Sequence, residues 1–186
     1  MLGGQRVDLR SRVLVAGVVP PPRFGREGEV LATAAAVRAA GADLVDVSLP
    51  PRLSGPVVRA GELPVAVRAG SAAEAAAARR AGAQVVLVPP EAAADTASEA
   101  GAEAGAVAVV VDDLAGVSAA REVAGRLGAP LAIDASRWGG PEAVGKEAAA
   151  VSLGCRVIRT ADVRRSRRVA EVMGALLAAR REDGGS

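Results

Sequence analysis

Charged and hydroxyl side chains stand at or just beyond the ends of several apolar runs in this sequence. Three of them are arginines that could contact a small ligand: Arg68, Arg137 and Arg159. The guanidinium group of arginine presents a planar fork of N–H donors that fits phosphate and carboxylate oxygens. If the ends of these runs meet, we expect Arg68, Arg137 and Arg159 to form a site for a small anion.

Carboxylates near these arginines leave other interpretations open. Asp112 or Asp134 could serve as a general base, because burial raises the pKa of a carboxyl group. Alternatively, the arginines extend their head groups into solvent or pair with aspartates, so that no ligand site remains. The aspartates available for such pairing are Asp46, Asp112, Asp134 and Asp162. The residue types alone identify no catalytic residue and no metal ligand.

Nucleophilic catalysis finds little support in the composition. The sequence contains no histidine and one cysteine, Cys155. Because no imidazole is available to remove its proton, Cys155 is expected to be a small buried thiol and not a nucleophile. A lone cysteine forms no internal disulfide, which fits a reducing cytoplasm.

The composition indicates one domain and excludes a nucleic-acid or membrane role. The 186 residues are 51% hydrophobic, enough for one buried core, and the net charge is only +2. A basic cluster at 164–168 has no interleaved aromatics, so it is expected to be a solvated helix face. No apolar run reaches the roughly 18 residues of a membrane span. We expect an N-terminal extension (1–12), a single domain (13–181) and a disordered tail (182–186) in a cytoplasmic protein.

Apolar runs and alanine-rich stretches alternate along the whole chain. Most of the runs are apolar on both faces, as in parallel strands that are covered by helices. Strands are expected at 13–18, 44–48, 65–67, 85–88, 106–111, 131–134 and 157–159. Helices are expected at 27–40, 51–60, 71–81, 91–104, 118–127, 141–153 and 163–180.

Glycines end several of these helices directly before the next strand. Gly41, Gly82 and Gly128 stand where a left-handed cap would turn a helix back toward a sheet. This repetition predicts an α/β fold, either a (β/α) barrel of the TIM type or a doubly wound sheet, and the first strand lacks a dinucleotide-binding glycine motif. Seven units are one short of a standard barrel. Either one strand is lost, or residues 7–9 supply it, or the barrel stays open and a partner covers the gap.

Three segments of the sequence carry specific motifs. They are residues 41–47 (Gly-Ala-Asp-Leu-Val-Asp-Val), 134–137 (Asp-Ala-Ser-Arg) and 159–163 (Arg-Thr-Ala-Asp-Val). In this order they resemble dihydropteroate synthases, a family of pterin-binding TIM barrels that join a pterin pyrophosphate to p-aminobenzoate. The corresponding family patterns are Gly-Ala-Asp-Ile-Ile-Asp-Val in the second strand, Ser-Arg-Lys at a later strand end, and Arg-x-His-Asp-Val at the closing strand. The resemblance covers nearly the whole chain and implies a compacted or incomplete pterin-binding barrel of seven recognisable βα units.

The resemblance implies a role for some residues and the loss of others. Asp112 or Asp113 could be the family's pterin-binding aspartate, Ser136 and Arg137 match pterin-pocket positions, and Arg159 matches the arginine that binds pyrophosphate. Several family residues are replaced in this chain: the family's asparagine is Val18 here, its aspartate is Arg68, its lysine is Trp138 and its histidine is Ala161. The lost asparagine helps to hold magnesium, and an apolar side chain cannot ligate that cation. No cofactor is therefore expected, and magnesium only if the ancestral site persists.

The expected function follows from a retained framework with replaced ligands. We predict a dihydropteroate-synthase-like protein of folate-pathway ancestry that is catalytically impaired and acts as a binding or partner subunit. It would form a homodimer through its last helices or bind another protein, since Met173, Leu176 and Leu177 give the last helix an apolar stripe. The alternative is an active barrel enzyme, a synthase or another transferase, on a pterin or small anionic substrate. Trp138 could stack on a ring, anchor a partner or cover the pocket.

Overall fold

Strands and helices alternate in this computed structural model, which describes residues 12–20, 26–47, 51–60, 63–100 and 107–183. The strands are β1 (Leu14–Val18), β2 (Leu44–Asp46), β3 (Val65–Arg68), β4 (Val85–Val88), β5 (Val107–Val111), β6 (Leu131–Asp134) and β7 (Cys155–Thr160). The helices are α1 (Glu27–Ala39), α2 (Pro51–Ala60), α3 (Ala72–Arg80), α4 (Pro90–Ala100), α5 (Val117–Leu127), α6 (Glu142–Ser152) and α7 (Val163–Asp183).

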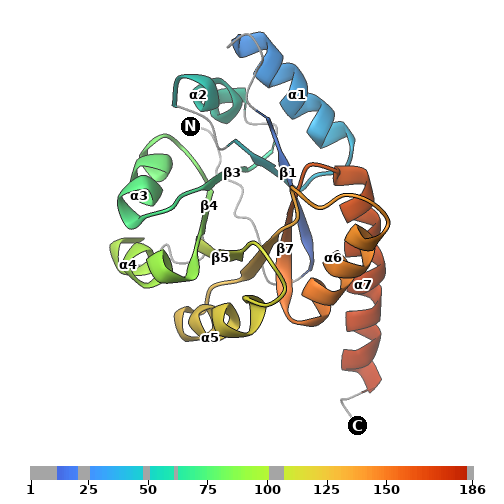
Figure 1. Ribbon diagram of the computed structural model, residues 1–186. Helices are drawn as coiled ribbons and strands as arrows, with labels where there is room; N and C mark the ends of the chain where they lie inside the picture. The colour runs from blue at the N-terminus through green and yellow to red at the C-terminus, as the bar shows by residue number, and fades with distance from the viewer. Residues whose placement is uncertain (1–11, 21–25, 48–50, 61–62, 101–106, 184–186) are drawn as a thin grey trace.

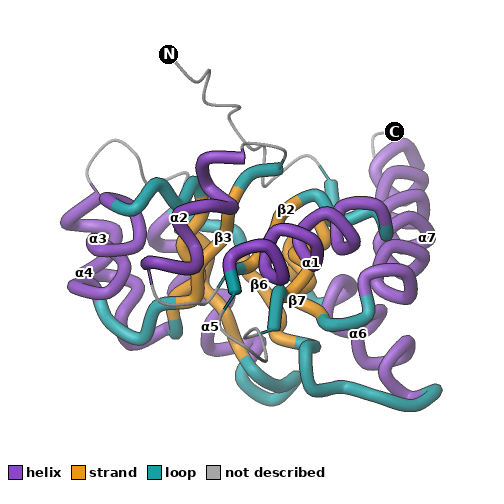
Figure 2. Tube along the Cα trace, turned by 90° about the horizontal axis from the view of Figure 1, so that it is seen from above, coloured by secondary structure: helices purple, strands orange, loops and turns teal. Residues whose placement is uncertain are grey.

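The strands close into a parallel barrel, and the helices lie around it (Figure 1 and Figure 2). Each strand pairs with its neighbours in chain order, and β1 pairs with β7 to complete the ring. This closing pair places Leu14 beside Val157 and Gly17 beside Thr160. The predicted TIM-barrel-like fold is confirmed, and the alternatives of an open barrel and a doubly wound sheet are wrong. Residues 7–9 lie outside the described part of the chain.

The barrel interior is filled by small and branched aliphatic side chains. Its buried cluster takes one or two residues from every strand: Leu14, Ala16, Leu44, Ala66, Val85, Leu87, Ala108, Val110, Ala132 and Val157. The diameter of a barrel falls with its strand number, so seven strands leave less interior space than eight. Four alanines in this cluster fit that narrow space.

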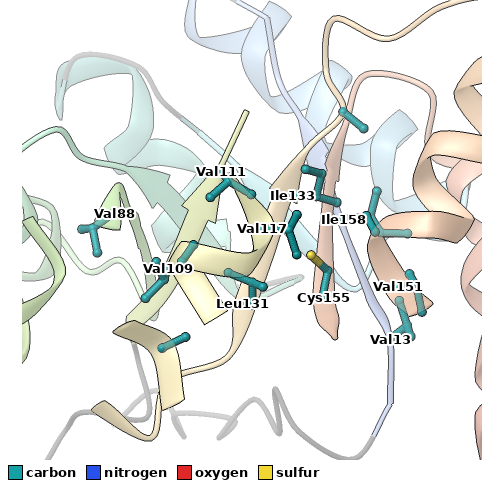
Figure 3. Packing of buried hydrophobic residues seen from close by; sticks show 14 of the residues in the cluster. Val13, Val88, Val109, Val111, Val117, Leu131, Ile133, Val151, Cys155 and Ile158 are labelled. Atoms are coloured by element: carbon teal, nitrogen blue, oxygen red, sulfur yellow. The ribbon is translucent and has the colours of Figure 1, made fainter. Parts of the chain in front are cut away.

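A second layer of apolar side chains packs between the outer face of the barrel and the helices. Figure 3 shows part of this layer, including Val109, Ile133, Cys155 and Ile158 from the strands and Val117 from α5. Because both faces of each strand are buried, the strands carry continuous apolar runs and not an alternating pattern. The expectation that Cys155 is a buried thiol is confirmed, and burial raises the pKa of this thiol to about 12.

The glycines that end the helices have the backbone conformation that their positions predict. Gly41 and Gly82 both have φ of 98° and Gly128 has φ of 60°, which L side chains rarely adopt. Ser71 caps α3 by accepting a hydrogen bond from the amide of Glu74 at 3.3 Å. The most visible differences are at the ends of elements, where β7 is longer than expected and α7 continues to Asp183.

Candidate functional site

Charged side chains form the last layer of the barrel interior. Side chains two residues apart in a strand point to the same face, so the residue two positions after an inward apolar residue also points inward. In five strands this residue is charged and lies at or just beyond the carboxyl end of the strand: Asp46, Arg68, Asp112, Asp134 and Arg159. These residues define the mouth layer, which lies at the end where barrel enzymes place their active sites.

Arg159 is held between two carboxylates and a hydroxyl group inside the mouth layer. Its Nε donates to Asp46 Oδ2, and its Nη1 donates to Asp134 Oδ2 at 2.7 Å. The same Nη1 donates to Ser136 Oγ at 3.0 Å. The Asp46 side chain is fully buried and that of Arg159 is 9% exposed. Arg159 is therefore a buried cation that is paired with two carboxylates through its Nε and Nη1 atoms.

Arg68 continues the chain of ion pairs toward solvent. Its Nη1 lies 2.5 Å from Asp134 Oδ2 and 2.8 Å from Asp112 Oδ1. Its Nη2 donates to Asp112 Oδ2 at 3.0 Å. The side chain of Arg68 is 32% exposed and that of Asp112 is 67% exposed. The mouth layer thus alternates in charge from Asp46 to Asp112, with the buried end at β2 and the exposed end at β5.

Ionisation equilibria at the mouth favour the charged forms. Burial raises the pKa of Asp134, but hydrogen bonds from Ser136 and the charge of Arg159 outweigh burial and hold the pKa below its ordinary value of 3.8. Burial lowers the pKa of Arg159, whereas the charges of Asp46 and Asp134 raise it, and the net shift is upward. The hydrogen bond to Asp112 raises the pKa of Arg68. The shift at Asp134 is opposite to the one that a general base would need.

The sequence-predicted site residues are brought together only in part. Arg68, Asp112, Ser136 and Arg159 meet in one network, and the pairing considered from the sequence occurs with three of the four aspartates. The exception is Asp162, which lies 3.7 Å from Arg165 on the outer helix α7. Arg137 is exposed and makes no ion pair within the described part of the chain. Asp46 was not among the predicted site residues, although its period-two spacing from Leu44 could have identified it.

Trp138 belongs to the outer layer of the fold. Its ring packs against the apolar cluster between strands and helices, and its backbone carbonyl accepts a hydrogen bond from Arg165 Nη1 at 3.2 Å. The ammonium of Lys146 lies 5.9 Å from the centre of the ring, within the range of a cation–π contact. These contacts give Trp138 a packing role between the β6–α6 loop and α7.

The basic cluster at 164–168 is divided between structural and exposed side chains. Arg165 pairs with the buried Glu147 at 2.9 Å, and Arg167 pairs with Asp43. Arg164 and Arg168 are exposed. The prediction of a uniformly solvated helix face is therefore wrong for Arg165 and Arg167, because their charges meet carboxylates of other segments.

Neither a metal centre nor a membrane span emerges from the described residues. No group of three or more histidine, cysteine, aspartate or glutamate side chains in that part of the chain could hold a metal ion. Among the same residues, no helix combines the length and the apolar character that crossing a membrane requires.

Comparison with solved structures identifies the fold. The dihydropteroate synthase of Yersinia pestis superposes with a TM-score of 0.69 at 17% identity, over 95% of this chain and 97% of the other. The 7,8-dihydropteroate synthase of Vibrio fischeri ES114 superposes with a TM-score of 0.69 at 13% identity, over 96% of this chain and 97% of the other. The synthase of Xanthomonas albilineans, solved with 7,8-dihydropteroate, superposes with a TM-score of 0.62 at 18% identity, over 92% of this chain and 96% of the other.

Sequence comparison adds no closer relative. No model of a known protein family matches the chain, and no curated protein sequence matches it. At identities of 13–18%, the likeness is one of fold. The predicted resemblance is thus confirmed at that level. The chain forms a closed barrel of seven strands, and its fold is similar to that of dihydropteroate synthases.

Proposed function

We propose that this protein uses a dihydropteroate-synthase fold of folate-pathway ancestry as a binding or partner subunit and has lost synthase activity. The observation that carries this proposal is the state of Arg159. Its guanidinium donates to Asp46 and Asp134 from within the barrel and to Ser136 at the rim. A pyrophosphate that binds Nε and Nη1 of Arg159 would have to displace these partners and break the ion pair of the fully buried Asp46 carboxylate with Arg159.

The charge of the mouth layer supports this proposal. Among the residues that the structure describes, three carboxylates and two guanidinium groups give the layer one excess negative charge. Transfer of a pterin from pyrophosphate requires cationic groups that stabilise the departing anion. The positions that resemble the asparagine and histidine of the family hold Val18 and Ala161, which provide neither a charge nor a polar side-chain atom.

One observation favours the second candidate, an active barrel enzyme on a pterin or small anionic substrate. The pair between Arg68 and Asp112 is the exposed end of the mouth layer, with side-chain exposures of 32% and 67%. Solvent screens such a pair, so a ligand could replace Asp112 on Arg68 at little cost. This candidate would use Arg68 as the anion contact and leave the pairs of Arg159 intact.

Association through the last helices is the second part of the proposal. Val172 and Leu176 on α7 are 60% and 52% exposed, although both are large apolar side chains. Exposed apolar patches on soluble folds often mark interaction surfaces. The partner would be a second copy of the chain or another protein.

Calorimetric titration with a pterin pyrophosphate analogue, with and without magnesium, tests whether the barrel mouth still binds the substrate of a synthase. We expect no saturable heat from the folded wild-type protein. Saturable binding that is lost in Arg68→Ala and retained in Arg137→Ala would instead support the enzyme on an anionic substrate. A second test asks whether the gene alone restores growth without folate to cells that lack their dihydropteroate synthase. Restored growth would refute the proposal.

A further inference from the structure

A groove with an apolar floor and a cationic end lies between α6 and α7, on the outside of the barrel. Its volume is about 420 Å³. The floor consists of aliphatic side chains from both helices: Val144, Ala148, Val169, Val172 and Met173. Figure 1 shows α6 and α7 side by side, with α7 continuing past the end of its neighbour.

The apolar floor is longer than a small ligand requires. On α7, Val169, Val172, Met173 and Leu176 follow the i, i+3, i+4, i+7 spacing of a single helix face, a span of about 10 Å. Leu176 extends the exposed stripe by one turn beyond Val172. On the α6 side, Val144 is 45% exposed. A stripe of this length between two helices is the shape that accepts a third helix lying in a groove.

The charge of the groove is concentrated at its α7 N-terminal end. Arg164, Arg165, Arg168 and Asp162 line that end. The positive charge of Arg165 is balanced by Glu147 behind it, at 2.9 Å. Arg164 and Arg168 are exposed and pair with no carboxylate within the described residues. The first turn of α7 adds the positive end of its helix dipole. The end of the groove therefore favours carboxylates.

A second copy of the chain matches this charge poorly. Two of the six arginines of α7, Arg165 and Arg167, are paired with Glu147 and Asp43, but Arg164 and Arg168 at the groove end have no carboxylate partner within the described residues. A two-fold symmetric contact places the same surface on both subunits, so the groove of a second copy would offer Arg164 and Arg168 only one lining carboxylate, Asp162. Complementary charge instead requires an acidic surface.

We propose that the groove binds an amphipathic helix of a different protein, with apolar residues at i, i+3, i+4 and i+7 and with aspartate or glutamate at the end that faces Arg164 and Arg168. This inference rests on the proposed role as a partner subunit and specifies the chemistry of the partner. It does not depend on whether the barrel mouth binds a pterin. Failure of the titration described above would therefore leave it intact, and its own failure would leave the mouth unaffected.

Fluorescence anisotropy with designed helical peptides tests the proposal on the full chain. The probe is a labelled peptide of about four turns with leucine at the four apolar positions and glutamates at one end. A matched peptide carries lysine in place of the glutamates, and another carries serine in place of the leucines. We expect saturable binding of the acidic peptide and at least about tenfold weaker binding of both others, the change that 1.4 kcal/mol produces.

Variants of exposed groove residues locate the binding. Arg168→Glu and Val172→Ser should each lower the affinity for the acidic peptide about tenfold. Arg126→Glu, a change at an exposed position on α5 outside the groove, should leave that affinity unchanged. Equal binding of acidic and basic peptides, or no effect of the groove variants, would overturn the proposal. So would absence of binding. Sedimentation showing a dimer that Val172→Ser dissociates would assign the groove to a second copy and also overturn it.

Discussion

Replacement of Arg159 by methionine is the most direct perturbation of the mouth layer. Methionine keeps much of the volume of the side chain but removes the cation that Asp46 and Asp134 share. Asp46 is fully buried and the Asp134 side chain is 7% exposed, so neither carboxylate can turn fully to water. In the variant, Asp46 and Asp134 therefore both lose their ion pair with Arg159.

The expected cost follows from the burial of these groups. Breaking a buried ion pair by removing one partner typically costs about 3–5 kcal/mol, because the other charge stays desolvated. Here two carboxylates lose the same partner, but Asp134 keeps Arg68 at 2.5 Å, so we expect a value within that range. For a domain of this length each kcal/mol lowers Tm by about 2–4 °C, which gives a fall of about 6–20 °C.

The pH dependence provides a sharper signature of the same perturbation. The pKa of Asp134 is lowered in the folded protein, so its ion pairs contribute stability above the ordinary value of 3.8, and this contribution is lost as the pH falls through the folded pKa. Without Arg159, the pKa of Asp134 is lowered less than in the wild-type protein. The difference in unfolding free energy between wild type and variant should therefore be largest near neutral pH and should narrow below about pH 4.

Urea denaturation followed by circular dichroism measures these free energies at several pH values. Arg137→Met is the matched control, because Arg137 is an exposed arginine of the same rim without an ion pair in the described part of the chain. It should change stability by less than about 0.5 kcal/mol. Arg159→Lys keeps the charge but not the fork of donors, and should fall between the two. A loss of less than about 1 kcal/mol in Arg159→Met would refute the view that buried carboxylates depend on this cation.

Two further predictions concern the packing around the barrel. A Cβ on Gly17 would clash with Val37 Cγ1, so Gly17→Ala should destabilise the fold by about 1–3 kcal/mol in thermal unfolding. By contrast, a Cβ on Gly28 would meet nothing within 4 Å, so Gly28→Ala should be neutral or stabilising. Equal effects of the two substitutions would contradict the packing of α1 on β1. The Cys155 thiol, with its pKa raised by burial to about 12, should not react with a thiol reagent at pH 8 until the protein is unfolded; rapid reaction of the native protein would show that the outer core opens.

Local patterns in the sequence were sufficient to predict most of the secondary structure. The strands at 85–88 and 131–134 have the predicted bounds, since short β-branched runs between helices leave little ambiguity. The terminal glycines were equally informative, because residues with a side chain rarely adopt the positive φ found at Gly41 and Gly82. These features depend on residues close in the chain.

Closure of the barrel had no local signal. It depends on the pairing of β1 with β7, which joins Leu14 to Val157 across most of the chain. An apolar strand carries no mark of which neighbour it will pair with, so the sequence left an open barrel possible. The ion pairs of the mouth had the same limitation: alternation predicts that Arg159 points inward, but not that Asp46, 113 residues away, is its partner.

The small diameter of the barrel explains why the charged side chains of the mouth layer pair with one another. In a seven-stranded ring the interior is small enough for long side chains from several strands to reach one another. Arg68 and Arg159 span the distances to carboxylates on other strands and both meet Asp134. A charged layer at the end of an apolar interior must be neutralised by ligand, by water or by its own members. Here its own members pair with one another, and the Asp112 carboxylate at the exposed end of the layer also faces water, which explains the presence of these arginines and aspartates through stability. Their presence alone therefore gives no support for retained catalysis, and a ligand at this mouth must compete with contacts that the fold requires.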